Sequence, residues 1–425
     1  MQFTRPQLVI LSTAGFIILF FLLVFFGVVP GLREDIGGRA TLQVWGIDDS
    51  KLWSNTISSF ENKYPGNAVK YTQLPEASYE KQLLNSLAAD KGPDIFFFKN
   101  SWLLKHGNKI VPTTDTAITL SAFKKLFPEV AEEDFVYQGK IYSLPLSIDT
   151  LALFYNRDIF DNKKIAVPPV TWDELKADIL RTREFGSKGA IVKSGLGIGA
   201  TSKSVTNATD ILNLLFLQFG TAMRNSIGDV SISNNEGLKA LNFYTQFAKY
   251  VNLYYTWAST SGPDIDSFAT KQLAMMLGYA SQIPEIKAKN PSLNFAITSA
   301  PQMNKKESVN FPNYWGLAVS SKTAAKDAAW NFVLFATTDP TTASAYATAG
   351  AKPPALRSLI GKYLNSPTLG VFAGQALTAK SWLQPDDVEV KKSFDDVLVV
   401  DDLSISVPDG DFVSLLGPSG CGKTT

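Results

Sequence analysis

The most specific chemical motif in this sequence lies at its end. The phosphate-binding pattern GxxxxGK(S/T) is matched by Gly417, Gly422, Lys423 and Thr424. In such a motif the glycines let backbone N–H groups approach phosphates, the lysine reaches the outer phosphates, and the threonine binds Mg²⁺. The sequence stops at Thr425, where the phosphate-binding helix should begin, and no Walker B acidic residue or further parallel sheet follows. We therefore expect no ATPase activity from this segment.

Other groups suited to catalysis are few. The sequence has one histidine, His106, and one cysteine, Cys421. This excludes His-rich metal sites and nucleophile systems that pair histidine with serine or cysteine elsewhere. We expect His106, in a polar stretch, to be an exposed loop residue. Because 40 basic residues balance 39 acidic ones, no nucleic-acid or polyanion partner is expected, and no cofactor is expected either.

The first 40 residues indicate whether the protein is attached to a membrane. Leu8–Val29 carries no charge and is long enough, at about 33 Å as a helix, to cross a hydrocarbon core of about 30 Å. We expect residues 8–29 to be a transmembrane signal anchor, residues 1–7 to be cytoplasmic, and residues 30–40 to be a linker. Cleavage after Ala40 is the alternative. Lipidation at the N-terminus is not expected, since the one cysteine lies at the opposite end of the sequence.

The body of the chain alternates predicted strands and helices. Strands are predicted at Thr41–Val44, Val69–Gln73 and Asp94–Phe98, with a helix between each pair. This order favours a doubly wound α/β lobe, which binds ligands beyond the carboxyl ends of its strands. Those ends carry Trp45–Asp49 and Phe98–Trp102.

The run from Gly139 to Leu175 reads GKIYSLPLSIDTLALFYNRDIFDNKKIAVPPVTWDEL. It predicts two strands, a Pro-rich turn at Pro168-Pro169, and a helix that Thr171 and Glu174 begin with a capping box. The run resembles the segment "GKxYxLPxxxxxxxLxYNxDxF…PPxTWxEL" of the extracellular solute-binding proteins of ABC importers, family 1, the group like maltose-binding protein. The family's late segment "AAWxFxxF…TG…PP" is similar to the sequence from Ala328 to Pro354.

The resemblance implies an α/β fold of two doubly wound lobes that close like a clamshell. It places the solute-binding domain at residues 41–386. The first lobe is expected at residues 41–147 and 296–339, and the second at 148–295 and 340–386.

The hinge between the expected lobes consists of crossings of the chain. The resemblance implies crossings near Leu146–Ile148, Phe295–Thr298 and Asp339–Pro340, with Phe295–Ser299 returning to the first lobe.

The resemblance also implies the site, in which aromatic rings stack on sugar faces while carboxylates and amides bind hydroxyls. The positions carried over are Asp49, Phe98, Lys99, Asn100, Trp102, Asp149, Tyr279, Tyr314 and Trp315. Trp257 is a further candidate, in a loop, for which core packing is an equal alternative. Asp149 has the alternative of bracing the hinge. The family's maltose-binding member has a charged pair where Ser101-Trp102 stand, so a maltodextrin ligand is not implied.

The tail at residues 387–425 looks like the truncated opening of an ABC ATPase of the sugar-importer type. The resemblance places Phe394 at the position that stacks on adenine. We expect a junction of two transporter components between Trp382 and Val390, loss of the last receptor helix there, and a disordered or loosely docked tail.

The function expected from the resemblance is that of a membrane-anchored, extracytoplasmic binding component of an ABC importer. Its ligand would be a mono- or oligosaccharide, with a polyol or sugar phosphate next, and its partners would be permease subunits and a separate ATPase. An anchored carbohydrate-active hydrolase and an ATPase are the alternatives, although no pair of acids suited to glycoside hydrolysis stands out.

Overall fold

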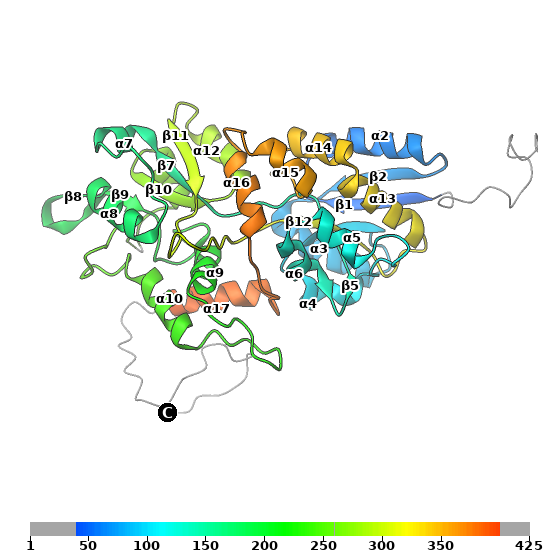
Figure 1. Ribbon diagram of the computed structural model, residues 1–425, viewed down its shortest axis with the longest axis horizontal. Helices are drawn as coiled ribbons and strands as arrows, with labels where there is room; N and C mark the ends of the chain where they lie inside the picture. The colour runs from blue at the N-terminus through cyan, green and yellow to red at the C-terminus, as the bar shows by residue number, and fades with distance from the viewer. Residues whose placement is uncertain (1–39, 259, 400–425) are drawn as a thin grey trace, which may run out of the picture.

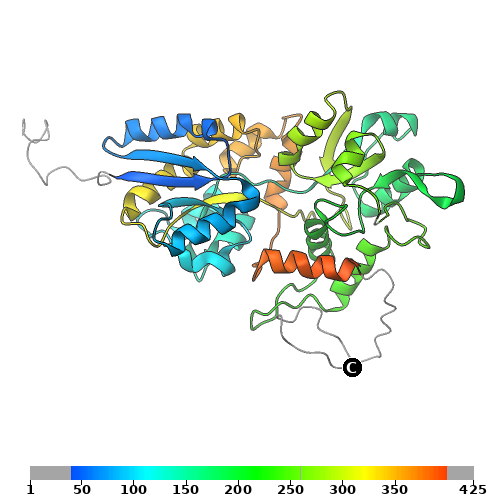
Figure 2. The same ribbon diagram turned by 180° about the vertical axis from the view of Figure 1, so that it is seen from behind.

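The computed structural model describes residues 40–258 and 260–399. These residues form two lobes side by side, each with its own mixed sheet and hydrophobic core (Figures 1 and 2). The two-lobed α/β architecture expected from the sequence is therefore confirmed. The expected anchor at residues 8–29 and most of the linker lie outside the described residues.

The first sheet has the strand order β2-β1-β3-β12-β6. Strands β1 and β2 are parallel to each other and β1 to β3, whereas β12 is antiparallel to both β3 and β6. Its strands are β1 (Thr41–Gly46), β2 (Ala68–Gln73), β3 (Ile95–Lys99), β6 (Leu144–Pro145) and β12 (Trp315–Val319). A separate hairpin pairs β4 (Val136–Tyr137) with β5 (Lys140–Ile141).

Helices cover this sheet because each places apolar side chains on one face. Trp53, just before α2, and Phe60 within it are fully buried, and Phe60 packs edge-on against Phe332 of α13. The helices of this lobe are α2 (Ser54–Lys63), α3 (Glu76–Ala88), α4 (Leu103–His106), α5 (Leu120–Leu126), α6 (Glu129–Phe135), α13 (Lys326–Thr338), α14 (Pro340–Ala349) and α15 (Arg357–Tyr363).

The second sheet has the strand order β11-β7-β10-β9-β8. Strand β10 is parallel to β9 and antiparallel to β7. The strands are β7 (Ala152–Asn156), β8 (Glu184–Phe185), β9 (Ile191–Leu196), β10 (Leu273–Gly278) and β11 (Phe295–Ser299). Every residue of β10 is buried, as befits the central strand of a covered sheet.

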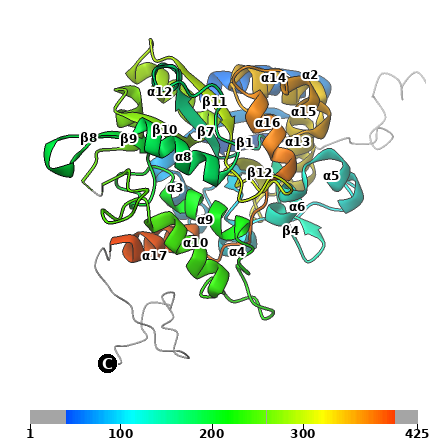
Figure 3. The ribbon, with the colours of Figure 1, turned by 60° about the vertical axis from the view of Figure 1, so that its left-hand side comes forward.

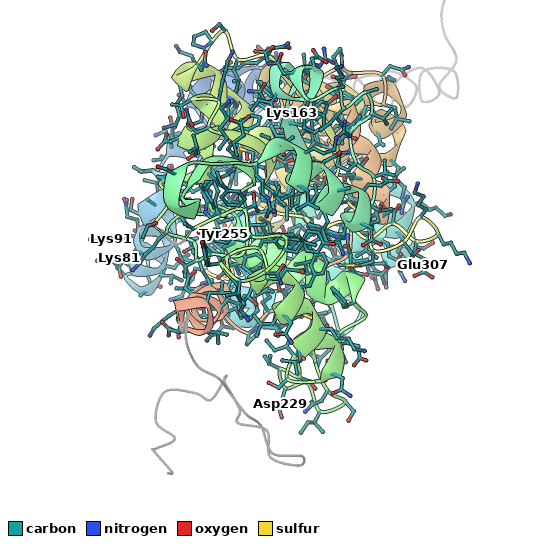
Figure 4. The ribbon with its side chains drawn as sticks, turned by 90° about the vertical axis from the view of Figure 1, so that its left-hand side faces the viewer. Lys81, Lys91, Lys163, Asp229, Tyr255 and Glu307 are labelled. Carbon is teal, nitrogen blue, oxygen red and sulfur yellow. The ribbon has the colours of Figure 1, made fainter. Side chains whose placement is uncertain are left out.

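The helices of the second lobe surround this sheet. They are α7 (Arg157–Asn162), α8 (Trp172–Thr182), α9 (Ala208–Gln218), α10 (Asn235–Thr245), α11 (Asp264–Ala269), α12 (Ile283–Lys289), α16 (Gly370–Gln375) and α17 (Asp387–Val399). The predicted capping box is present at α8, where Thr171 accepts the N–H of Glu174 and Glu174 accepts that of Thr171. In Figure 4, which faces the free end of this lobe, Asp229 marks the tip of the loop between α9 and α10.

The positions of the chain crossings differ in part from the expected ones. The first crossing lies where predicted, between β6 and β7. Phe295–Ser299 does not return to the first lobe, because it pairs along its whole length with β7 of the second sheet. The second crossing therefore follows at residues 300–314.

Asp339–Pro340 is likewise no crossing. It joins α13 to α14, and both helices pack in the first lobe, where α14 contacts α2 and α15 contacts α5. Residues 340–363 thus belong to the first lobe rather than the second. The chain leaves that lobe after α15, because α16 contacts β11.

The C-terminal boundary of the receptor fold also needs correction. Asp387–Val399, expected to begin a loosely docked ATPase fragment, is a helix that packs beside α9 (Figure 3). Phe394 is 4% exposed and its ring lies 5.5 Å from that of Phe216. The hydrophobic positions Val390, Phe394 and Leu398 recur every four residues, so they line one helical face. The second lobe therefore keeps a last helix, and Phe394 is a core residue.

We predict that Phe394→Ala destabilises the protein by about 3 kcal/mol, the low end for removing a buried phenyl ring. The low end is expected because an apolar cavity of about 80 Å³ already lies beside Phe394, between α9 and α10. Urea denaturation of the variant measures this loss. Val388→Ala is the control, since Val388 is 52% exposed on the same helix. Equal stability of the two variants would show that α17 is not docked in solution.

Candidate functional site

Polar side chains from both lobes meet where the strand ends of the two sheets face each other. Asp48 follows β1, Lys99 ends β3, and Tyr279 follows β10. Such carboxyl edges are where open α/β sheets bind ligands.

The centre of this region is a cluster of Asp210, Tyr279 and Asn313. Asp210 lies in the first turn of α9, and its Oδ2 accepts bonds from the Tyr279 hydroxyl at 2.8 Å and the Asn313 amide at 3.3 Å. Burial raises the pKa of Asp210, an effect that the nearby Lys99 charge opposes. Within the described part of the chain both bonds end on Oδ2, which leaves Oδ1 available to accept a solute hydroxyl.

Asp149 braces this cluster from the first crossing of the chain. Its Oδ1 accepts the N–H groups of Thr150 at 2.9 Å and Ala280 at 3.0 Å, and its Oδ2 accepts that of Ser281 at 3.0 Å. Burial raises the pKa of Asp149 to about 6, although these N–H bonds act to lower it. The carboxylate thus holds the turn that carries Tyr279, which is the bracing role weighed as the alternative to solute contact.

Lys99 faces the same region from the first lobe. Its ammonium lies 3.1 Å from Oδ2 of Asp387 on α17, and that oxygen also accepts the Ser101 hydroxyl at 2.9 Å. The Lys352 ammonium pairs with Asp48 at 2.6 Å and acts to lower the pKa of Asp149. Charged groups of the two lobes therefore lie close enough to interact.

Two predicted contacts, Asn100 and Tyr314, turn inward instead. Both donate to Oδ2 of the buried Asp134, Asn100 at 3.1 Å and Tyr314 at 2.7 Å. Burial raises the pKa of Asp134 to about 7. This satisfied buried network indicates a structural role for Asn100 and Tyr314.

The predicted aromatic contacts are mostly packing residues. Phe98 and Trp257 have 0% and 1% exposure and lie in the cores of the first and second lobe, and Trp257 donates its indole N–H to Ser204. Trp102 is also buried and stacks on Tyr79, 6.2 Å between centroids. Trp315 is only half-buried and pairs in register with Lys99, which places it at the end of the first sheet where β3 ends and β12 begins.

Asp49 and His106 complete the predicted positions. Asp49 is exposed, and its Oδ1 accepts the N–H of Lys51 at 2.8 Å, which caps a short 3₁₀ turn. We expected His106 to be exposed, but it is only 5% exposed. In the short helix α4 its ring packs edge-on against Trp102, and its Nε2 lies 2.8 Å from Oε1 of Glu80. Gly417, Gly422, Lys423 and Thr424 lie outside the described residues.

The sequence interpretation missed Asp210, Asn313, Lys352 and Asp387. Asp210 carried a usable signal, because it is the one acidic residue in the apolar stretch that forms α9. The other three lie in loops or at a helix start, where no local pattern marks a side chain that meets a partner far along the sequence.

The described residues contain no helix long and apolar enough to span a membrane.

In comparisons of sequence, a binding protein of Brucella abortus is 23% identical over 265 residues, which cover 62% of each chain. The chain thus spans less than two thirds of the length of the curated relatives it matches. A second such relative, from Brucella suis, matches over the same share.

Solved structures show the same fold at low sequence identity. An ABC-transporter solute-binding protein of Thermotoga lettingae, bound with alpha-D-tagatose, has a TM-score of 0.67 and 22% identity, covering 85% of this chain and 95% of that one. The maltose-binding periplasmic protein of Listeria monocytogenes, in complex with maltose, has a TM-score of 0.69 and 19% identity, covering 85% and 92%. The two-lobed fold is therefore that of solute-binding proteins.

The family comparison covers most of both lobes. The model of the family described as bacterial extracellular solute-binding protein matches residues 55–362, from α2 to α15. By this match over more than half of its length, the chain belongs to the family of bacterial extracellular solute-binding proteins.

Proposed function

We propose that this protein binds a carbohydrate between its lobes and delivers it to an importer. The observation that carries the proposal is the Asp210 carboxylate, fixed by Tyr279 and Asn313 with one oxygen left to accept a hydroxyl. Sugars present rows of hydroxyl groups, which ionised carboxylates bind through strong, short hydrogen bonds. Tagatose and maltose in two proteins of the same fold support this ligand class.

The neighbouring side chains fit the same ligand. Trp315 offers a half-buried indole at the start of β12, and an aromatic face of this kind packs against the apolar C–H face of a sugar ring. Lys99, next to Trp315 in the sheet, supplies a donor. We assign solute contact to Asp210, Trp315 and Lys99, and a positioning role to Asp149 and Tyr279. Asp49, exposed in the turn after β1, is assigned to solute entry.

The proposed mechanism is closure of the two lobes around the solute. Binding would shift the population from open to closed forms by as much as the solute prefers the closed one. The closed form would then dock on permease subunits powered by a separate ATPase. Residues 8–29 would hold the receptor at the outer face of the cell membrane, where the family's extracellular solutes are found.

A ligand screen by thermal unfolding of the purified chain tests this proposal. A bound sugar present at about a thousand times its Kd should add about 4 kcal/mol to the free energy of unfolding. Asp210→Asn should weaken that sugar about 10- to 100-fold, the loss expected for a hydrogen bond to a charged group. Asp266→Asn, which removes an exposed carboxylate paired with Lys289, is the matched control. A screen of sugars and polyols without any shift, or equal affinity in both variants, would contradict the proposal.

The bracing carboxyl of Asp149 gives a pH dependence. Since its pKa of about 6 lies above the ordinary 3.8, the folded state binds the proton more tightly, and stability falls as the pH rises between these values. The shift of about two units corresponds to about 3 kcal/mol. Urea denaturation at pH 4 and pH 7 should therefore show Asp149→Asn gaining up to about 3 kcal/mol relative to the unaltered protein. Parallel pH profiles would show that the carboxyl is not buried as described.

A further inference from the structure

The first turn of α17 crosses from the second lobe to the first. Asp387 accepts bonds from Lys99 at 3.1 Å and Ser101 at 2.9 Å. Asp386, one residue earlier, lies 3.0 Å from the ammonium of Lys105, which also pairs with Glu80 at 2.8 Å. Two carboxylates of the C-terminal segment thus pair with lysines at the end of β3 and just after it in the first lobe.

These carboxylates are fixed to the second lobe by the rest of the helix. Val390, Phe394 and Leu398 are buried in the second core. Near its other end, Asp395 accepts the N–H of Ser202 at 2.8 Å and its hydroxyl at 2.5 Å. The bonds of Asp386 and Asp387 to lysines therefore join one lobe to the other, at the edge of the proposed solute site.

The charge balance of the cleft follows from these pairs. Lys99, Lys105 and Lys352 are each paired with a carboxylate, whereas among residues 40–258 and 260–399 Asp149 and Asp210 have only uncharged hydrogen-bond partners. Lys391, an exposed side chain of α17, also acts to lower the pKa of Asp210. Burial acts to raise the pKa of Asp387, but the Lys99 charge and the two hydrogen bonds hold it below its ordinary value, so this carboxylate is ionised.

We propose that Asp387, assisted by Asp386, is a specificity-determining residue that makes the closed cleft select neutral sugars and reject acidic ones. This inference rests on the proposed carbohydrate function. A uronic acid or sugar phosphate entering the site would bring a negative charge to Asp210 and would find the charges of the first-lobe lysines already balanced by carboxylates. An uncompensated buried charge is costly, and like charges placed against it are a common means of rejecting a wrong ligand.

The substitution Asp387→Asn removes the negative charge of this side chain while keeping its shape, so it tests the effect of the charge alone. The amide keeps the size of the side chain and an oxygen for Ser101, while Lys99 loses its counter-charge. The ratio of affinities for an acidic sugar over its neutral parent, such as galacturonate over galactose, should rise about 10-fold or more. Lys99→Gln should lower the same ratio, because it leaves Asp387 unpaired. Since the two changes act in opposite directions, loss of folding in one does not remove the test.

The experiment is isothermal titration of the full chain and its variants with paired neutral and acidic sugars. Asp396→Asn is the matched control, an identical change at an exposed position of α17, and it should leave the ratio unchanged. An unaltered protein that prefers acidic sugars, or a ratio equal in Asp387→Asn and Asp396→Asn, overturns the inference while carbohydrate binding stands.

A different result separates the inference from the function on which it rests. If no sugar binds to any of the proteins, the carbohydrate proposal fails, and the same proteins are titrated with inorganic phosphate. Phosphate binding to Asp387→Asn but not to the unaltered chain would still support anion exclusion by Asp387. Phosphate binding to both, or to neither, overturns it.

Discussion

The fold depends on a buried side-chain amide between the lobes. Gln375 of α16 donates to the Thr150 hydroxyl at 3.0 Å and the Leu151 carbonyl at 2.9 Å, and accepts the Ala300 N–H at 2.8 Å. Thr150 and Leu151 lie on the first crossing of the chain and Ala300 begins the second. Backbone that passes between two cores has no sheet partner for every polar group, and leaving one unpaired there costs about 1 to 3 kcal/mol. One amide thus aligns both crossings with α16.

This alignment sets what the cleft can contain. Asn313 lies on the second crossing and donates its backbone N–H to the carbonyl of Asp149 on the first. The two crossing segments therefore lie side by side, and their side chains meet in the same region. Asp149 then holds the turn of Tyr279, and Asn313 reaches Asp210. The proposed solute site is therefore assembled from the hinge outward. The aromatic side chains beside it, Trp102 above all, mainly support the wall of the first lobe.

The parts of the fold that local chemistry determines could be predicted from the sequence. The capping box at Thr171 and the alternation of strands and helices before β3 follow from neighbours within one helical turn or one strand. Which of the two lobes the strand Phe295–Ser299 joins could not be predicted in this way, because an apolar strand can pair equally well with either sheet. Its register with β7, about 140 residues earlier, decides the question.

The candidate site was predictable to a smaller extent. The resemblance pointed to particular strand ends, but it could not say which way a side chain turns. Asn100 and Tyr314 turn inward because the buried Asp134 carboxylate must be paired with hydrogen-bond donors. The burial of Asp134 follows from the packing of α6, which the local sequence does not show. Asp210 and Asn313, 103 positions apart, become partners only through the hinge.

The C-terminal boundary shows how packing and charge can depend on one segment. The phosphate-binding motif led us to expect the receptor's end at about residue 386, yet the apolar face of α17 completes the core against α9. Asp386, just before this helix, and Asp387, its first residue, pair with Lys105 and Lys99 of the opposite lobe. A boundary before α17 would expose Phe216 and leave Lys99 without its counter-charge at the same time. Since a helix fixed at one end can place a charge accurately at the other, the stability of the second lobe and the electrostatics of the cleft are properties of a single element.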